Sequence, residues 1–149
     1  MLNPDFRDML SALCDEGVEF IVVGAYALAA YGSPRATGDI DIWVRATDEN
    51  AQRVWRALQS FGAPLFDLSV DDLKKPDIVF QVGVVPRRID IITSITAVTF
   101  DEAWPERKEV EIAGLKFAVL GRNHLIQNKR AVARPKDIAD IAWLEGEDK

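Results

Sequence analysis

Three aspartates in the chain have the type and spacing expected of a metal site. Asp39 and Asp41 lie in the segment Gly-Asp-Ile-Asp-Ile-Trp-Val (residues 38–44), and Asp90 lies in Arg-Ile-Asp-Ile-Ile (residues 88–92). Both segments are rich in β-formers, so we expect two strands. A carboxylate inside an apolar strand is costly unless it faces water, a partner or a cation. The pattern therefore indicates divalent-metal binding and phosphate chemistry.

Residues two apart on a strand share one face, so Asp39 and Asp41 should point to the same side. Trp43 falls on that side as well, where it is either a core aromatic or the wall of a base pocket. The alternative for the two acids is ordinary alternation at a solvent-facing strand. If the three carboxylates do cluster, they repel in the absence of a cation, and at least one should have a raised pKa.

Composition narrows the class of protein. With 149 residues, 48% of them hydrophobic, the chain is expected to form one domain, residues 1–149, with a sizeable core. A formal net charge of −6 argues against general nucleic-acid affinity through charge alone. Neither a membrane-length apolar run nor a signal-peptide pattern is present, so we expect a cytoplasmic location and no membrane partner.

The chain holds one cysteine, Cys14, and one histidine, His124. An internal disulfide and a thiolate zinc cluster are thereby excluded, and a lone histidine cannot make a zinc site. We expect Cys14 to be a small buried residue of an amphipathic helix and His124 to lie on the surface of a later helix.

Periodicity and capping residues predict the elements that must position the acids. Asn3, Pro4 and Asp5 begin a helix that Gly17 can close. Strands are expected over residues 18–23, 39–45, 77–83, 87–93, 107–112 and 115–119, the last four as two hairpins. Helices are expected over residues 26–31, 49–60, 122–132 and 136–145, with helical turns near 69–73 and 100–104. This order indicates an α+β fold: a mixed β-sheet with helices packed on it and two C-terminal helices.

Several motifs together resemble a known superfamily. A strand ends in Gly24-Ala25, the acid-x-acid strand follows, and a later strand supplies Asp90. This is similar to the DNA polymerase β-type nucleotidyltransferases, in which a glycine followed by glycine or serine precedes an acid-x-acid strand and a third acid. Residues 23–28, 32–41 and 134–140 look like those of small bacterial nucleotidyltransferases related to the AbiEii toxins. The resemblance covers most of residues 18–145 and implies the nucleotidyltransferase fold.

The resemblance also implies an activity. Such an enzyme would move an NMP group from an NTP to a hydroxyl acceptor and release pyrophosphate. Two Mg²⁺ ions, or Mn²⁺ in their place, would be held by Asp39, Asp41 and Asp90, with Asp90 accepting the proton of the acceptor. Relatives act on RNA ends, proteins or small molecules, so the acceptor stays open. Because the chain is short, a homodimer or a partner protein is a hypothesis for the acceptor surface.

Five residues are candidates for holding the triphosphate: Gly24, Ala25, Arg35, Thr37 and Lys129. Gly24 would let the backbone approach a phosphate or would simply pack a helix against a strand. Ala25 departs from the glycine or serine of the family and offers no hydroxyl. Arg35 would clamp a phosphate or pair with an acid, and Thr37 is as readily a loop-shaping residue. Lys129 would reach the phosphates from an apolar helix stripe, or would hold its ammonium group in water at the margin of that stripe.

Two further acids open the last expected helix. Asp137 and Asp140 occupy its first turn, where carboxylates favour the helix dipole. We interpret them as structural residues or as partners of Lys129 and Arg134, and not as metal ligands.

Two other functions remain open from the sequence. A degenerate nucleotidyltransferase fold could act as a nucleotide-binding or protein-interaction module, for example in a toxin–antitoxin pair, and Ala25 favours this. The intact set of three acids weighs against it, since a pure binder has little reason to keep repelling carboxylates. A metal-dependent phosphohydrolase is the third possibility, but no histidine cluster supports it.

Overall fold

The computed structural model describes residues 3–32, 38–84 and 87–146. Its α-helices are α1 (Pro4–Asp15), α2 (Gly24–Ala30), α3 (Asp48–Phe61), α4 (Phe100–Ala103), α5 (Arg122–Val132) and α6 (Pro135–Gly146). Its strands are β1 (Phe20–Val23), β2 (Asp39–Val44), β3 (Val79–Val84), β4 (Arg87–Ile92), β5 (Lys108–Ile112) and β6 (Leu115–Val119). Two short 3₁₀ turns, η1 (Asp72–Lys74) and η2 (Trp104–Glu106), complete the described elements.

The strands form one mixed sheet in the order β3-β4-β2-β1-β6-β5. β2 runs parallel to β4 and β1 runs parallel to β6, whereas the β1–β2, β3–β4 and β5–β6 pairs are antiparallel. The α+β class with a mixed sheet is confirmed, as are both expected hairpins. The acid-bearing strand β2 lies in the middle of this sheet, between β4 and β1.

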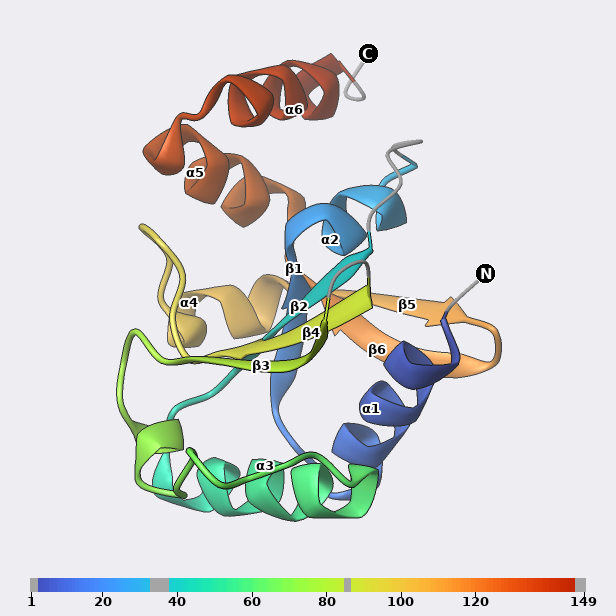
Figure 1. The fold of residues 1–149 in the computed structure, drawn as a ribbon. Helices are drawn as coiled ribbons and strands as arrows, with labels where there is room; N and C mark the ends of the chain where they lie inside the picture. Colours follow the sequence, from blue (N-terminus) through green and yellow to red (C-terminus); the bar gives the residue numbers. More distant parts are fainter. Residues whose placement is uncertain (1–2, 33–37, 85–86, 147–149) are drawn as a thin grey trace.

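Helices cover the sheet on both sides (Figure 1). α1 and α3 pack against each other on one side, and the α5–α6 pair lies on the other. The apolar stripe of α1 is buried, as are Ile40, Ile42 and Val44 of β2. The alternation of β2 therefore puts its isoleucines into the core and leaves Asp39 and Asp41 on the opposite face.

Local sequence accounts for most element boundaries. The Asn3 side chain accepts hydrogen bonds from the backbone of Asp5 (2.8 Å) and Phe6 (3.3 Å), which begins α1 as expected. Thr47 caps α3, and Gly62 ends it in the left-handed conformation at φ 90°. α2 begins at Gly24, two residues before the expected start. Gly24 has φ +71°, which turns the chain directly from β1 into the helix.

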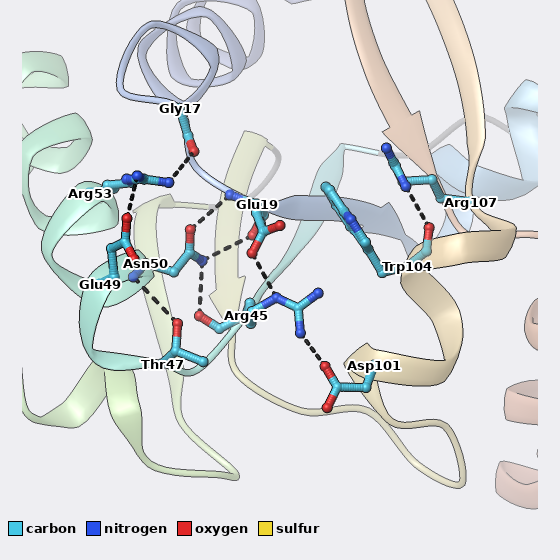
Figure 2. A network of polar contacts seen from close by, with 10 residues as sticks. All are labelled: Gly17, Glu19, Arg45, Thr47, Glu49, Asn50, Arg53, Asp101, Trp104 and Arg107. Atoms are coloured by element: carbon cyan, nitrogen blue, oxygen red, sulfur yellow. Dashed lines mark hydrogen bonds and ion pairs between the residues drawn. The ribbon is translucent and has the colours of Figure 1, made fainter.

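A buried asparagine ties α3 to the ends of β1 and β2 (Figure 2). Asn50, 2% exposed, accepts a hydrogen bond from the backbone N–H of Glu19 at 2.8 Å. Its amide nitrogen donates to the carbonyls of Glu19 (3.0 Å) and Arg45 (2.9 Å). Arg45 in turn pairs with Glu19 and Asp101 and lies 4.6 Å over the Phe100 ring. These bonds satisfy backbone groups that a loop would otherwise bury unpaired, and they anchor the far end of β2.

Two burial expectations were wrong. Cys14 is exposed, because the core stripe of α1 consists of Phe6, Met9, Leu10 and Leu13 and leaves position 14 outside it. His124 is buried at 8% exposure, with Nε2 3.7 Å from a carboxylate oxygen of Glu106. It sits in the first turns of α5, where that helix meets the end of η2.

The helical turn expected near residues 69–73 is present as η1. Ser69 and Asp72, the first residue of η1, exchange backbone–side chain hydrogen bonds that hold the start of this turn. None of the helices in the described parts of the chain has the length and apolarity needed to cross a bilayer.

Candidate active site

The register of β2 and β4 brings the three sequence-selected aspartates together. The two strands are parallel neighbours in which Asp41 is paired with Asp90 and Asp39 with Arg88. Paired residues on adjacent strands point to the same face, so the carboxylates of Asp41 and Asp90 are neighbours and Asp39 lies two residues along. We call Asp39, Asp41 and Asp90 the acid cluster. Asp90 is 7% exposed, and the other two are half-buried.

Arg88 lies among these acids. Its Nε donates to Asp90 Oδ1 at 2.9 Å, and one terminal nitrogen donates to Asp90 Oδ2 at 3.2 Å and to Asp39 Oδ2 at 3.3 Å. The guanidinium thus holds both oxygens of Asp90 and bridges to the neighbouring strand. These ionic hydrogen bonds raise the pKa of Arg88.

Gly24 fits closely against the acid cluster. The backbone at this position approaches Asp41 so closely that an added Cβ would collide with Asp41 Oδ2. Val23, the residue before it, is paired with Asp41 across the β1–β2 ladder. The structure shows Gly24 packed closely against the side chain of Asp41, and the approach of its backbone to a phosphate stays a prediction. The positive φ of Gly24 adds a second reason why only glycine suits this turn.

Asp41 has the altered proton affinity expected of clustered carboxylates. Burial, followed by the charge of Asp90 and hydrogen bonding with it, raises the pKa of Asp41 from 3.8 to about 6. Asp39 contributes in the same direction, and Arg88 opposes the shift. The expectation that at least one acid of the cluster would show a raised pKa is confirmed.

Trp43 belongs to the core and does not line an open pocket. It is on the same side of β2 as the acids, yet it is only 1% exposed, and its ring meets Phe100 edge-on at a centroid distance of 5.0 Å. α4, which begins at Phe100, covers this part of the face. The open part of the acid face therefore ends before Trp43, and the base-pocket interpretation of this residue was wrong.

Lys129 is buried at the contact between α5 and α6. Its Nζ lies 3.0 Å from Asp140 Oδ2 and 3.6 Å from Asp137 Oδ1, and its side chain is 8% exposed. The interpretation of Asp137 and Asp140 as partners of Lys129 and Arg134 is confirmed. The alternative in which the ammonium group of Lys129 lies in water at the margin of the helix stripe was therefore wrong.

Arg134 is the exposed member of this network. Its Nε and a terminal nitrogen donate to the two carboxylate oxygens of Asp137 at 2.6 Å and 3.1 Å. This bidentate bond lowers the pKa of Asp137, and it raises the pKa of Arg134, to which the charge of Asp41 also contributes. The start of α6 is therefore within electrostatic reach of the acid cluster, with a guanidinium held in a fixed orientation.

The remaining candidates divide into described and undescribed residues. Ala25 is half-buried in the first turn of α2, directly after Gly24. Arg35 and Thr37 lie outside the described residues. Arg88 is the residue that sequence reasoning missed. The available signal was its position two residues before Asp90 on the same strand, which puts both side chains on one face.

The chemistry of the acid cluster fits hard divalent cations. Carboxylate oxygens are the ligands that Mg²⁺ and Mn²⁺ prefer, and the raised pKa of Asp41 marks a place where positive charge is favoured. In the described part of the chain, however, no three acid, histidine or cysteine side chains stand in a ready-made metal-binding arrangement. In this structure Arg88 donates hydrogen bonds to oxygens of Asp39 and Asp90.

A separate hollow of about 590 Å³ lies along α5. Its walls include Ala97, Gln127, Arg130 and Glu145. No member of the acid cluster lines it, and its Arg130 is paired with Glu145 at 3.4 Å. The candidate site is therefore the acid cluster, together with the strands β2 and β4 and the turn at Gly24.

Comparison with known proteins identifies a family. The profile of a family described as "Nucleotidyl transferase of unknown function (DUF2204)" matches residues 3–146 of the chain. The search of curated proteins gave no significant match.

Solved structures share the fold. A protein from Thermotoga maritima described as a candidate nucleotidyltransferase superposes with a TM-score of 0.62 at 21% identity, over 99% of this chain and 96% of that one. The lincosamide antibiotic adenylyltransferase LnuA, with lincomycin bound, gives a TM-score of 0.63 at 14% identity, over 97% of each chain. The antibiotic-resistance factor ANT(2'')-Ia gives 0.63 at 15% identity, over 97% of this chain and 83% of that one.

Proposed function

The chain belongs to this family of nucleotidyl transferases, and we propose that it transfers the NMP group of an NTP to a hydroxyl acceptor with release of pyrophosphate. The observation that carries the proposal is the register of β2 and β4. It pairs Asp41 with Asp90 and sets Asp39 beside them, next to the turn at Gly24. The three carboxylates would hold two Mg²⁺ ions, with Mn²⁺ as a substitute, and when bound these ions would neutralise the phosphate charge.

The residues of the chain have distinct tasks in this reaction. The acceptor hydroxyl attacks the α-phosphorus of the NTP, the new O–P bond forms, and the bond to the pyrophosphate oxygen breaks. Asp90 would accept the proton of the hydroxyl, the role that the family resemblance gives to the third acid; its position opposite Asp41 supports this. Asp39 and Asp41 reach the same face from the neighbouring strand. Gly24 keeps the turn close to Asp41.

Binding of the triphosphate would use the turn at Gly24 and Ala25 together with Arg35 and Thr37. The ammonium group of Lys129 is paired with Asp140 and Asp137, which weakens the case for its direct contact with a phosphate. Arg134 is the better candidate for direct phosphate contact, because its guanidinium is exposed, oriented by Asp137 and within electrostatic reach of Asp41.

The acceptor is not identified by these residues. LnuA binds a small antibiotic, and this chain covers 97% of the LnuA chain. Short length by itself is therefore weak support for a homodimer or a partner protein as the source of the acceptor surface. RNA ends, proteins and small molecules all stay open, and a cytoplasmic location stays a prediction from the sequence.

The direct test measures pyrophosphate release from ATP, CTP, GTP or UTP with Mg²⁺ and a panel of RNA, protein and aminoglycoside or lincosamide acceptors. Asp41→Asn and Asp90→Asn should lower the rate by about 100-fold or more, because each removes a charge that the reaction needs. Asp67→Asn, which neutralises an exposed acid, is the matched control and should retain the wild-type rate.

The rival proposal is a binding module that uses the same fold without catalysis, for example in a toxin–antitoxin pair. Ala25, which offers no hydroxyl to a phosphate, is the observation that favours it. Calorimetric titration of the four NTPs with and without Mg²⁺ separates the two. Binding that needs Mg²⁺ and is lost in Asp41→Ala supports the enzyme. Binding that ignores Mg²⁺, with no pyrophosphate formed, supports the module.

A further inference from the structure

The guanidinium of Arg88 supplies a positive charge directly beside the carboxylates of the acid cluster. It makes three hydrogen bonds to two of the three carboxylates, at 2.9, 3.2 and 3.3 Å, and reaches from β4 across to β2. Its side chain is 27% exposed and that of Asp90 is 10% exposed, so the guanidinium is more accessible to water than the carboxylate it holds. The bonds hold both oxygens of Asp90 in one orientation.

Three neighbouring carboxylates cannot all stay ionised in a half-buried site without a positive charge near them. Asp41 and Asp90 are opposite each other in the ladder, and Asp39 is on the same face. Arg88 supplies one positive charge to this group from within the chain. The fold can therefore form with its acids already converged before any divalent ion or nucleotide arrives.

The same contacts set a cost on metal binding. A divalent ion held by Asp39 and Asp90 must share or take the oxygens that Arg88 now contacts, and it must also approach a guanidinium of like charge. Arg88 has a fixed positive charge at every physiological pH, so it cannot leave by losing a proton. When a divalent ion binds, the Arg88 side chain must therefore move to break its contact with Asp39.

We propose that Arg88 is a stand-in cation: it holds the acid cluster together in the metal-free protein and is displaced from Asp39 when divalent ions bind. The proposal rests on the proposed metal-dependent function. It makes Arg88 a positioning residue that stabilises the empty site and weakens the binding of metal without nucleotide. In consequence, free Mg²⁺ or Mn²⁺ would load poorly, and the metal would enter together with the nucleotide that needs it.

The test uses Mn²⁺ as the probe, with free Mn²⁺ measured by electron paramagnetic resonance in the absence of nucleotide. Arg88→Gln should bind Mn²⁺ about tenfold more tightly than the wild type, the size expected when one like charge is removed near a divalent ion in a water-exposed site. The metal-free variant should melt at a lower temperature than the wild type. Addition of Mn²⁺ should raise the melting temperature of the variant by more than it raises that of the wild type.

Two controls separate charge from position. Arg87→Gln removes an exposed positive charge from the adjacent residue of β4 and should leave Mn²⁺ affinity close to that of the wild type. Arg88→Lys keeps the charge but loses the planar fork, and it should bind Mn²⁺ nearly as weakly as the wild type while melting lower.

The outcomes are distinct. Unchanged or weaker Mn²⁺ binding in Arg88→Gln overturns the stand-in role, and if Asp90→Asn then abolishes the binding seen in the wild type, the proposed metal function survives. Absence of binding in both the wild type and Arg88→Gln overturns the stand-in role and counts against the metal function as well. An unchanged melting temperature of metal-free Arg88→Gln also overturns it.

Discussion

Asp41 is the residue whose titration reports on the state of the acid cluster. Its pKa of about 6 follows from burial and from the neighbouring Asp90. Between roughly pH 4 and 6 the folded protein keeps a proton that the unfolded chain has lost. Folding stability attributable to Asp41 is therefore present at low pH and is lost as the pH rises through this window.

This predicts a pH-dependent difference between the wild type and Asp41→Asn. The variant cannot carry the charge, so it should gain stability relative to the wild type as the pH rises from about 4.5 to 7. Urea unfolding at a series of pH values measures the difference. Acids outside the acid cluster cancel in the comparison, including Asp137, whose pKa is lowered by Arg134. A difference that stays constant with pH would contradict the assignment.

Addition of Mn²⁺ gives the same experiment a second readout. Metal ligands must be deprotonated, so Mn²⁺ affinity of the wild type should rise with pH through about 6, where Asp41 loses its proton.

At the scale of the elements, the contact between α5 and α6 depends on buried charge. Lys129 is enclosed with Asp140 and Asp137, and Arg134 completes the group from the helix junction. Removing one partner of such a group leaves an opposite charge buried without compensation. The sequence interpretation of Lys129 as a phosphate ligand and the structural role seen here make different predictions for its removal.

Lys129→Met should lower the free energy of unfolding by about 3–5 kcal/mol, because it leaves the carboxylate of Asp140 buried without its closest cation. Combining it with Asp140→Leu should recover part of the loss. Lys136→Met, which changes an exposed lysine of α6, is the control and should have little effect. Urea denaturation measures all three. Wild-type stability in Lys129→Met, together with weakened nucleotide binding, would instead favour direct phosphate contact.

At the scale of the whole molecule, the candidate site depends on parts far apart in the chain. The turn at Gly24, the strands β2 and β4, and the start of α6 contribute to it from residues 24 to 134. The sheet lies between α3 and the α5–α6 pair, so a ligand that contacts both the strands and Arg134 would join two layers (Figure 1). Ligand binding should then stabilise the fold as a whole.

We expect Mg²⁺ with the preferred NTP, at about 100 times its Kd, to stabilise the wild type by about 2.7 kcal/mol. For a chain of this size that corresponds to a rise in Tm of roughly 5–10 °C. Differential scanning fluorimetry measures it, with the nucleotide in EDTA and the Asp90→Asn variant as controls. An equal rise in EDTA would support the binding-module alternative.

Much of this fold follows from local sequence. Asn3 and Thr47 cap their helices, alternation defines β2, and the two hairpins form where the strand patterns are closest together. These features act over a few residues, so they can be read without tertiary contacts. Burial was less predictable. Cys14 and His124 were misjudged because periodicity gives the spacing of a face but not which neighbouring element covers it.

The sequence alone determined the type and spacing of the three aspartates and the turn that precedes them. Only the tertiary structure decided that β2 and β4 are parallel neighbours, that Asp41 is opposite Asp90, and that Arg88 lies between the acids. The physical reason is that strand order and register arise from packing the whole sheet under its helices. The net charge of a site depends on all the charged residues that this packing brings together. A local sequence pattern does not show which residues those are.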